Sequence, residues 1–223
     1  MFLDVSFYLN QVIPALNKGL MVSLALIFPS ATCGLIIGII IGTMRAFGKG
    51  PIYGFATVYA TIFRGTPLVV QLFILYFGLP NLGIYLSPYL AAVLGFTLCS
   101  GAYHSEYIRG ALLSIKKGQI LAAQALGFST WSSLTNIILP QAMRRALPGC
   151  GNEIIYLIKY SSLAYIITCI ELTGQGKIIA SMTFRFSEVF LVVGFYYLVM
   201  VTIATWLLKK LEERFYVPGF GSR

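Results

Sequence analysis

Residues 118–145, GQILAAQALGFSTWSSLTNIILPQAMRR, lie between two strongly apolar regions of the 223-residue chain. Basic residues flank this stretch on both sides, which is typical of a loop on the cytoplasmic face of a membrane protein. Residues 119–126 favour a helix that Gly127 ends, and Ser129 or Thr130 can cap a second helical piece. A short helix outside the bilayer, with small residues and a glycine stop, is shaped to press into a groove of another protein. The stretch therefore predicts a docking element on a membrane protein.

The composition agrees with a membrane location. Hydrophobic residues make up 58% of the chain and charged residues 10%, whereas a soluble domain carries about 25% charged residues. The chain has room for about five helical spans, since each needs about 20 residues. The net charge of +9 is expected from the cytoplasmic loops of such a protein, so we expect contact with the lipid bilayer and no nucleic-acid partner. We therefore predict an all-α, polytopic membrane protein.

Several chemistries are not indicated by the sequence. The four cysteines lie inside or at the edges of apolar runs and form no C-x-x-C pair, so we expect neither disulfides nor a metal site. There is no phosphate-binding loop of the form G-x-x-x-x-G-K-[ST], so no ATP and no other cofactor is expected on this chain. No catalytic cluster is present, which argues against an enzyme, and the N-terminus lacks the features of a cleavable signal peptide.

The order of apolar and polar segments predicts one transmembrane domain over residues 1–223. Residues 1–18 form an amphipathic lead-in that ends near Pro14 and is expected at the membrane surface. An outer loop is expected over residues 171–187. The expected spans are about 19–44, 53–79, 88–113, 147–170 and 189–208, with the cytoplasmic coupling segment 118–145 between the third and the fourth.

Glycines predict two local features of these spans. Three of them repeat every four residues in the first span and line one helix face for close packing. In the second span, Gly65 and Pro67 can break the helix beside an arginine that must face protein or water. The three packing glycines are Gly34, Gly38 and Gly42.

The distribution of Lys and Arg predicts the orientation. Eleven basic residues fall on one side of the expected spans and three on the other, which places the N-terminus outside and the C-terminus in the cytoplasm. The cytoplasmic group comprises Arg45, Lys49, Arg109, Lys116, Lys117, Arg144, Arg145, Lys209, Lys210, Arg214 and Arg223, and the outer group Lys18, Lys177 and Arg185.

Charged residues inside the spans are the candidates for function, because a charge is costly in lipid. Arg64, Glu106, Glu153 and Lys159 qualify. Glu106 either binds a mobile cation, such as an amino-acid ammonium, or pairs with Lys159 and holds helices together. Glu153 is close to the cytoplasmic end of its span, which favours a structural role. His104 is alone, so a hydrogen bond to a neighbour is favoured over a proton relay.

A series of motifs resembles the permease subunits of bacterial ATP-binding-cassette importers, in the branch that carries polar amino acids. These permeases have a cytoplasmic motif E-A-A, then three residues, G, nine residues and I-x-L-P. The present chain keeps that spacing, but Leu121 replaces the glutamate. The matching motifs are Leu121-Ala122-Ala123 with Gly127 and Ile137-x-Leu139-Pro140, Phe63-Arg64-Gly65-Thr66-Pro67-Leu68 with Gln71, Ser100-Gly101-Ala102-Tyr103 with Glu106, Lys117-Gly118-Gln119, Leu139-Pro140-Gln141-Ala142 and Gly151-Asn152-Glu153.

The resemblance implies a permease of the bacterial inner membrane that moves a polar amino acid. Its partners would be cytoplasmic ATPase subunits that bind the ATP, an external amino-acid-binding protein, and a second permease in a homodimer or heterodimer. The rival interpretations are a stand-alone proton-coupled carrier that uses Glu106 and His104, and a membrane enzyme or scaffold. The residues implied to contact the ATPase are Leu121, Ala122, Ala123, Leu126, Gly127, Phe128 and Ser129.

The resemblance also implies a substrate site between the third and fourth spans. Tyr160 stands where the family has an acid, and Cys99 where it often has an asparagine. Because a negative charge is lost at position 160, we expect a neutral polar or weakly basic amino acid rather than arginine. The implied substrate-binding residues are Glu106, Tyr160, Ser161, Ser162, Cys99, Arg64 and Gln71.

Overall fold

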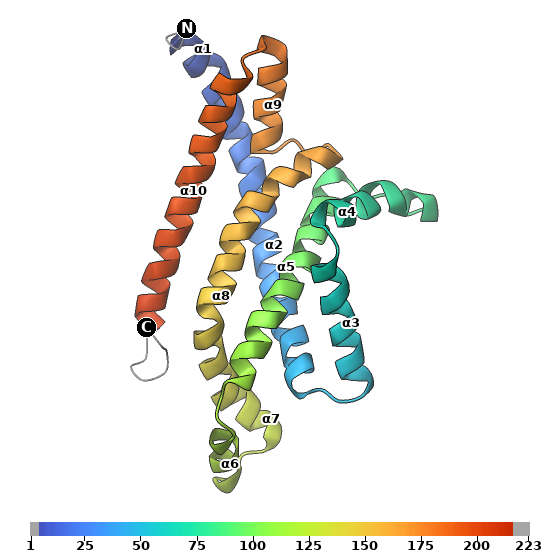
Figure 1. Ribbon diagram of the computed structural model, residues 1–223, viewed down its shortest axis with the longest axis vertical. Coiled ribbons are helices and arrows are strands. Elements are labelled where there is room, and N and C mark those ends of the chain that lie inside the picture. Colours follow the sequence, from blue (N-terminus) through green and yellow to red (C-terminus); the bar gives the residue numbers. More distant parts are fainter. Residues whose placement is uncertain (1–4, 216–223) are drawn as a thin grey trace.

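A computed structural model describes residues 5–215, and all regular structure in this range is helical. Most of the long helices run along one axis of an elongated bundle (Figure 1). This confirms the all-α prediction for the described part of the chain. The elements are α1 (Val5–Phe7), η1 (Tyr8–Val12), α2 (Ile13–Phe47), α3 (Pro51–Gly65), α4 (Leu68–Phe73), η2 (Ile74–Gly78), η3 (Leu79–Leu82), α5 (Pro88–Leu113), α6 (Lys117–Ala125), α7 (Thr130–Ser133), η4 (Leu134–Ile138), α8 (Leu139–Tyr160), η5 (Ser161–Ile167), α9 (Leu172–Thr183) and α10 (Phe186–Phe215).

The pair α2 and α5 forms the centre of the bundle, and glycines bring the two helices together. A Cβ added at Gly38 would lie 2.3 Å from the Cβ of His104, and one at Gly42 would lie 2.8 Å from the carbonyl oxygen of Ser105. At Gly34 the nearest atom, in Ser100, would be 3.2 Å away. The predicted glycine face of α2 is therefore confirmed, and α5 is the helix that packs against it.

The N-terminal segment is part of the first long helix. Residues Val5–Phe47 form one helical run of 43 residues, so the expected end of the lead-in near Pro14 is wrong. The Ile13 N–H bonds the Tyr8 carbonyl in a π-turn immediately before the proline. A π-turn shifts the hydrogen-bond register by one residue, which allows the helix to continue past Pro14.

The second apolar segment is sharply bent, as Gly65 and Pro67 predict. Helix α3 and the following Leu68–Leu82 segment meet at 103°. The side-chain amide of Gln71 donates to the carbonyl oxygens of Phe63 at 3.0 Å and Thr66 at 3.1 Å, and so takes up backbone groups freed by the break. The elements α4, η2 and η3 form an arm that projects from the side of the bundle (Figure 1).

The connection expected as an outer loop is mostly helical. Helix α9 begins after Glu171, whose carboxylate accepts the N–H groups of Thr173 and Gly174, both at 2.9 Å. This carboxylate is buried and also accepts from the hydroxyls of Tyr197 at 3.0 Å and Ser23 at 3.4 Å. The side chain thereby caps α9 and joins it to α10 and α2.

By length and composition, two helical runs of the described chain can cross a membrane, Val5–Phe47 and Phe186–Phe215. The number rises to four if each of two bent pairs is one span: Pro51–Gly65 with Leu68–Leu82, and Thr130–Ile167 with Leu172–Thr183. Helix α5 has 26 residues but is not among the helices that are both long and apolar enough to cross a membrane. The arrangement of five spans stays a prediction.

Candidate functional site

Helices α6 and α7 of the coupling segment lie at one end of the molecule (Figure 1), and its last residues form the start of α8. Helix α6 ends at Ala125, and the chain turns at Gly127 as predicted, where a φ of +86° favours glycine. The Phe128 N–H returns to the carbonyl oxygen of Ala123 at 3.1 Å, which closes the helix end. The Ser129 hydroxyl accepts the Ser132 N–H at 3.1 Å and caps α7, so the predicted helix–turn–helix is confirmed.

Large apolar side chains of the coupling segment are exposed. Leu126 is 79% exposed and Trp131 is 72% exposed, whereas Ala123 is buried. Exposed apolar groups gathered at one end of a molecule are typical of a protein interface. The side chains of Leu121 and Phe128 and the surfaces of Ala122, Gly127 and Ser129 are exposed as well.

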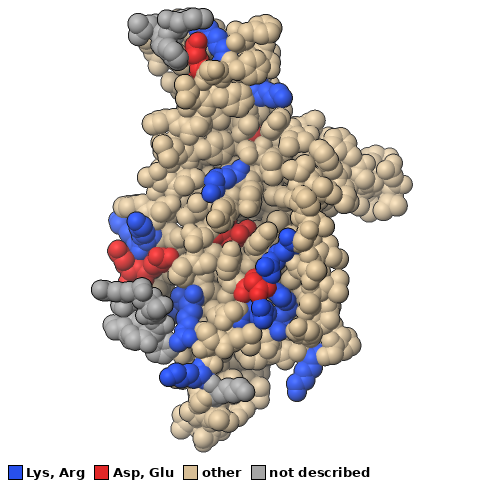
Figure 2. Space-filling view, in the orientation of Figure 1, with Lys and Arg blue, Asp and Glu red and all other residues tan. Residues whose placement is uncertain are grey.

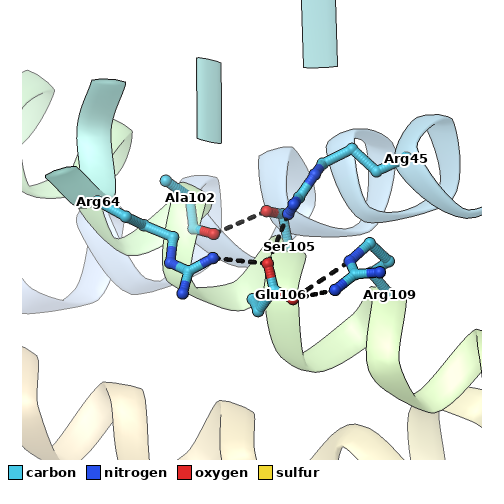
Figure 3. Close-up of polar contacts among 6 residues, drawn as sticks. All are labelled: Arg45, Arg64, Ala102, Ser105, Glu106 and Arg109. Atoms are coloured by element: carbon cyan, nitrogen blue, oxygen red, sulfur yellow. Dashed lines mark hydrogen bonds and ion pairs between the residues drawn. The ribbon is translucent and has the colours of Figure 1, made fainter. Parts of the chain in front are cut away.

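A second candidate site is an ionic cluster around Glu106, shown in Figure 3. The Glu106 carboxylate accepts from Arg45 at 2.8 Å and Arg64 at 2.6 Å on one oxygen, and from Arg109 on the other. Arg45 comes from the last turn of α2 and Arg64 from the last turn of α3, while Arg109 is one turn further along α5. The three guanidinium groups thus converge on one carboxylate.

Of the two alternatives for Glu106, the pairing with Lys159 is wrong. Lys159 is exposed on α8, and its ammonium lies over the Tyr156 ring, 4.3 Å from the centroid. Arginines at the ends of α2 and α3 supply the counter-charges instead, because both helices end beside Glu106. The order of residues along the chain does not reveal this convergence.

The cluster carries an excess of positive charge and is partly open. The Glu106 side chain is 26% exposed and that of Arg64 is 36% exposed. The Arg64 guanidinium also lies 5.6 Å from the centroid of the Tyr103 ring. A guanidinium can form bidentate hydrogen bonds to a carboxylate, so the accessible Arg64 is suited to an anionic group.

The other predicted substrate residues occupy two places. Cys99 is buried on α5 and Tyr160 is half-buried at the end of α8, and these two helices pack against each other. The Ser161 and Ser162 hydroxyls both donate at 2.7 Å to carbonyl oxygens three residues earlier, and so are engaged with the helix. Gln71 is separate from this pair and braces the bend next to Arg64.

Sequence reasoning missed the position of Glu153. It is 2% exposed, and its Oε1 has no hydrogen-bond partner among the described residues. On the same stripe of α8, one turn earlier, a Cβ at Gly149 would lie 2.8 Å from the Tyr107 ring of α5. The sequence did contain a signal for this position, because intervals of three and four residues set one stripe on α8. The stripe consists of Gly149, Glu153, Tyr156 and Tyr160, and it places Glu153 between α5 and α8.

Comparisons with known proteins extend over almost the whole chain. Residues 34–216 match the family model described as "Binding-protein-dependent transport system inner membrane component". The glutamine transport system permease protein GlnP of Escherichia coli strain K12 is 40% identical over 204 residues, which cover 91% of this chain and 93% of that protein. The arginine transport system permease protein ArtQ of Bacillus subtilis strain 168 is 37% identical over 215 residues, covering 96% and 98%. The solved structure described as "Crystal structure of an amino acid ABC transporter with histidines" aligns with a TM-score of 0.85 and 34% identity, covering 96% of this chain and 98% of that one.

Proposed function

Because this chain belongs to the family of binding-protein-dependent transport system inner membrane components, as a permease subunit of an ATP-binding-cassette importer for polar amino acids, we propose that it forms the membrane pathway for a neutral polar amino acid. The near full-length similarity to a glutamine permease carries this proposal. Tyr160 supports the neutral substrate, because it offers a hydroxyl where the family has an acid.

The rival function, a stand-alone proton-coupled carrier, does not agree with the relatives, which are permeases of importers. The geometry offers it no support either. Glu106 is engaged by three arginines, and both ring nitrogens of the buried His104 lack a hydrogen-bond partner among the described residues.

Membership of this family implies ATPase subunits, a binding protein and a second permease as partners. The exposed apolar surface of the coupling segment is the proposed contact with the ATPase. Leu121 stands where the motif has an acid, so the groove that receives it is expected to be apolar at that point.

The proposed substrate site keeps the predicted residues and gives them distinct roles. Arg64, held by Glu106 and by the bend that Gln71 braces, is the proposed ligand for the substrate carboxylate. Cys99 and Tyr160 are the proposed contributions of α5 and α8 to this site. Ser161 and Ser162 shape the end of α8, where a change of helix geometry could release their hydroxyls to the substrate.

Reconstitution of the complete importer tests this function. Vesicles containing the permease and its ATPase, with ATP inside and the binding protein outside, are supplied with each standard L-amino acid in turn. Neutral polar amino acids such as glutamine are expected to accumulate only with ATP. Accumulation driven by a proton gradient without ATPase would contradict the proposal.

The same vesicles test the coupling segment. Gly127→Val forces a branched side chain into a left-handed backbone and is expected to uncouple ATP hydrolysis from uptake while the complex stays assembled. Gly194→Val is the matched control, because an added Cβ at Gly194 meets nothing within 4 Å. Equal coupling in the two variants would exclude the proposed role of Gly127.

A further inference from the structure

A hydrogen-bonded contact between α5 and α8 closes the base of the coupling segment. The Arg145 guanidinium donates from Nη1 to the carbonyl oxygen and to the hydroxyl oxygen of Ser114, both at 2.8 Å. Ser114 is the residue at which α5 ends, and Arg145 lies 31 residues later, in the second turn of α8. The chain between them forms α6, α7 and η4 (Figure 1), so these elements belong to a loop that the contact closes.

The contact serves groups that a helix end leaves without a partner. The last carbonyl groups of an α-helix accept no bond within the helix, and they carry the negative end of its dipole. Arg145 brings both a donor and a positive charge to this end of α5. The Ser114 hydroxyl donates in turn to the Ala111 carbonyl oxygen at 2.7 Å, which orients the hydroxyl oxygen as an acceptor for Arg145. The result is a charge-assisted contact with a defined direction.

Apolar packing joins the same regions but does not fix how they slide past one another. The buried or half-buried side chains of this packing include Leu112, Ile115, Ile120, Ile138 and Ala142. Hydrophobic burial has no preferred direction, so several registers of α8 against the end of α5 would bury similar area. The two hydrogen bonds to Ser114 form in only one of them. Arg145 therefore sets the register that the apolar packing leaves open.

Motion of α6 can reach the long helices by two routes. One is the connection from α5 to α6, which is not helical over residues 114–116 and can bend. The other runs from α6 through its packing on α7 and η4, and η4 continues directly into α8. The contact between Arg145 and Ser114 ties the end of α5 to the second route. While it is formed, a displacement of α6 moves α5 and α8 together instead of being absorbed in the bend.

Helix α5 connects this contact to the ionic cluster. Glu106 lies eight residues before Ser114, which is about 12 Å along the helix. The Glu106 carboxylate accepts from Arg64 at 2.6 Å, and Arg64 is the proposed ligand of the substrate carboxylate. A displacement of the end of α5 therefore reaches the proposed substrate site through one continuous helix.

We propose that Arg145 is a positioning residue for transport, which transmits motion of the coupling segment to α5 by holding α8 and the end of α5 in one register. This role rests on the proposed function and adds to it a residue outside the proposed ATPase contact. It separates docking of the ATPase, assigned to the surface around Gly127, from transmission of the motion. A purely structural Arg145 would instead affect the stability of the permease and leave the use of ATP unchanged.

The test measures amino-acid uptake and ATP hydrolysis in the same vesicles, which contain the complete importer at a temperature well below the unfolding midpoint of each variant. The readout is uptake per ATP hydrolysed, because a loss of assembled complex lowers both rates and leaves their ratio unchanged. Arg145→Met removes the hydrogen bonds and keeps an unbranched side chain. Loss of a charge-assisted contact changes an equilibrium by about tenfold, so the ratio should fall by about threefold to tenfold. Arg145→Lys keeps a charged donor and should give a ratio between those of Arg145→Met and wild type.

A charge exchange tests whether Ser114 is the partner that matters. Ser114→Lys brings two cations together, and Arg145→Glu places a carboxylate at the negative end of α5, so each should lower the ratio. The double variant restores an attraction between the two positions and should recover the ratio to within about threefold of wild type. Arg144→Met is the matched control, because it removes the exposed arginine next to Arg145 and should keep the wild-type ratio.

Three results would overturn the role of Arg145. They are a wild-type ratio in Arg145→Met, two lowered single variants of the charge exchange without recovery in the double variant, and an equal fall in Arg144→Met. Should Arg145→Met fail to assemble, Arg145→Lys and the charge exchange decide the question by the same ratio. A wild-type importer that accumulates no amino acid with ATP would instead refute the proposed function, and the role of Arg145 with it.

Discussion

At the scale of single residues, one carboxylate holds three helices in place. Glu106 bonds arginines from the ends of α2 and α3 and one from its own helix. Three guanidinium groups repel one another at such short separation, so they can converge only around a negative charge. Neutralising Glu106 should therefore cost more than the loss of a single surface ion pair.

We expect Glu106→Gln to lower the stability of the purified permease by about 2 kcal/mol, because charge-assisted hydrogen bonds are lost and cations remain unpaired. For a chain of this size the midpoint of thermal unfolding would fall by about 4–8 °C. Adding Arg45→Met removes one of the repelling charges and should restore part of the loss. A midpoint equal to that of wild type in Glu106→Gln would show that the cluster does not stabilise the fold.

At the scale of elements, the packing of α2 on α5 is fixed by the absence of side chains on one face. Gly38→Ala would place a Cβ 2.3 Å from that of His104, so the two helices must separate. Overpacking of this kind costs about 1–3 kcal/mol. Thermal unfolding should show a lower midpoint for Gly38→Ala.

The matched control is Gly194→Ala on α10, where an added methyl group meets nothing within 4 Å. Alanine replaces glycine favourably in a free helix position by about 0.5–1 kcal/mol, so the midpoint of this variant should stay the same or rise. A similar decrease in both variants would show that helix propensity, and not the α2–α5 contact, determines the effect.

Local patterns explain the features of the fold that could be predicted. The repeat of Gly34, Gly38 and Gly42 identifies a packing face, and Gly65 with Pro67 identifies a break, because both depend on backbone and near neighbours alone. Gly127 could be recognised in the same way as the end of a short helix. These signals are contained within a few residues of sequence.

Features that depend on distant segments could not be predicted. The capping of α9 requires a glutamate that is also held by Ser23 and Tyr197, more than twenty residues away in either direction. The arginines around Glu106 meet only because α2 and α3 end near the same turn of α5. The burial of Glu153 likewise depends on how α8 lies on α5, although its spacing with Tyr156 and Tyr160 indicates the face.

For the molecule as a whole, the distribution of charge and the arrangement of the helices indicate the same orientation in the membrane. Basic side chains gather over the half that contains α6 and α7, and fewer lie toward the opposite end (Figure 2). The N-terminal helix and α9 lie at that opposite end (Figure 1). Positive charge is retained on the cytoplasmic side of inner-membrane proteins, so the α6–α7 end is the proposed cytoplasmic end. The described chain then begins outside and α10 ends inside.

Single cysteines test this orientation with a thiol reagent that does not cross membranes. Removing Cys33 gives a suitable background, because the other three cysteines are buried. Lys49→Cys and Gln124→Cys replace exposed residues, one in the α2–α3 turn and one in α6, and should react only when the cytoplasmic face is accessible in inverted vesicles. Ser87→Cys and Ser181→Cys, exposed before α5 and in α9, should react in intact cells. Labelling of position 124 in intact cells would reverse the proposed orientation, and with it the side from which the ATPase can reach the coupling segment.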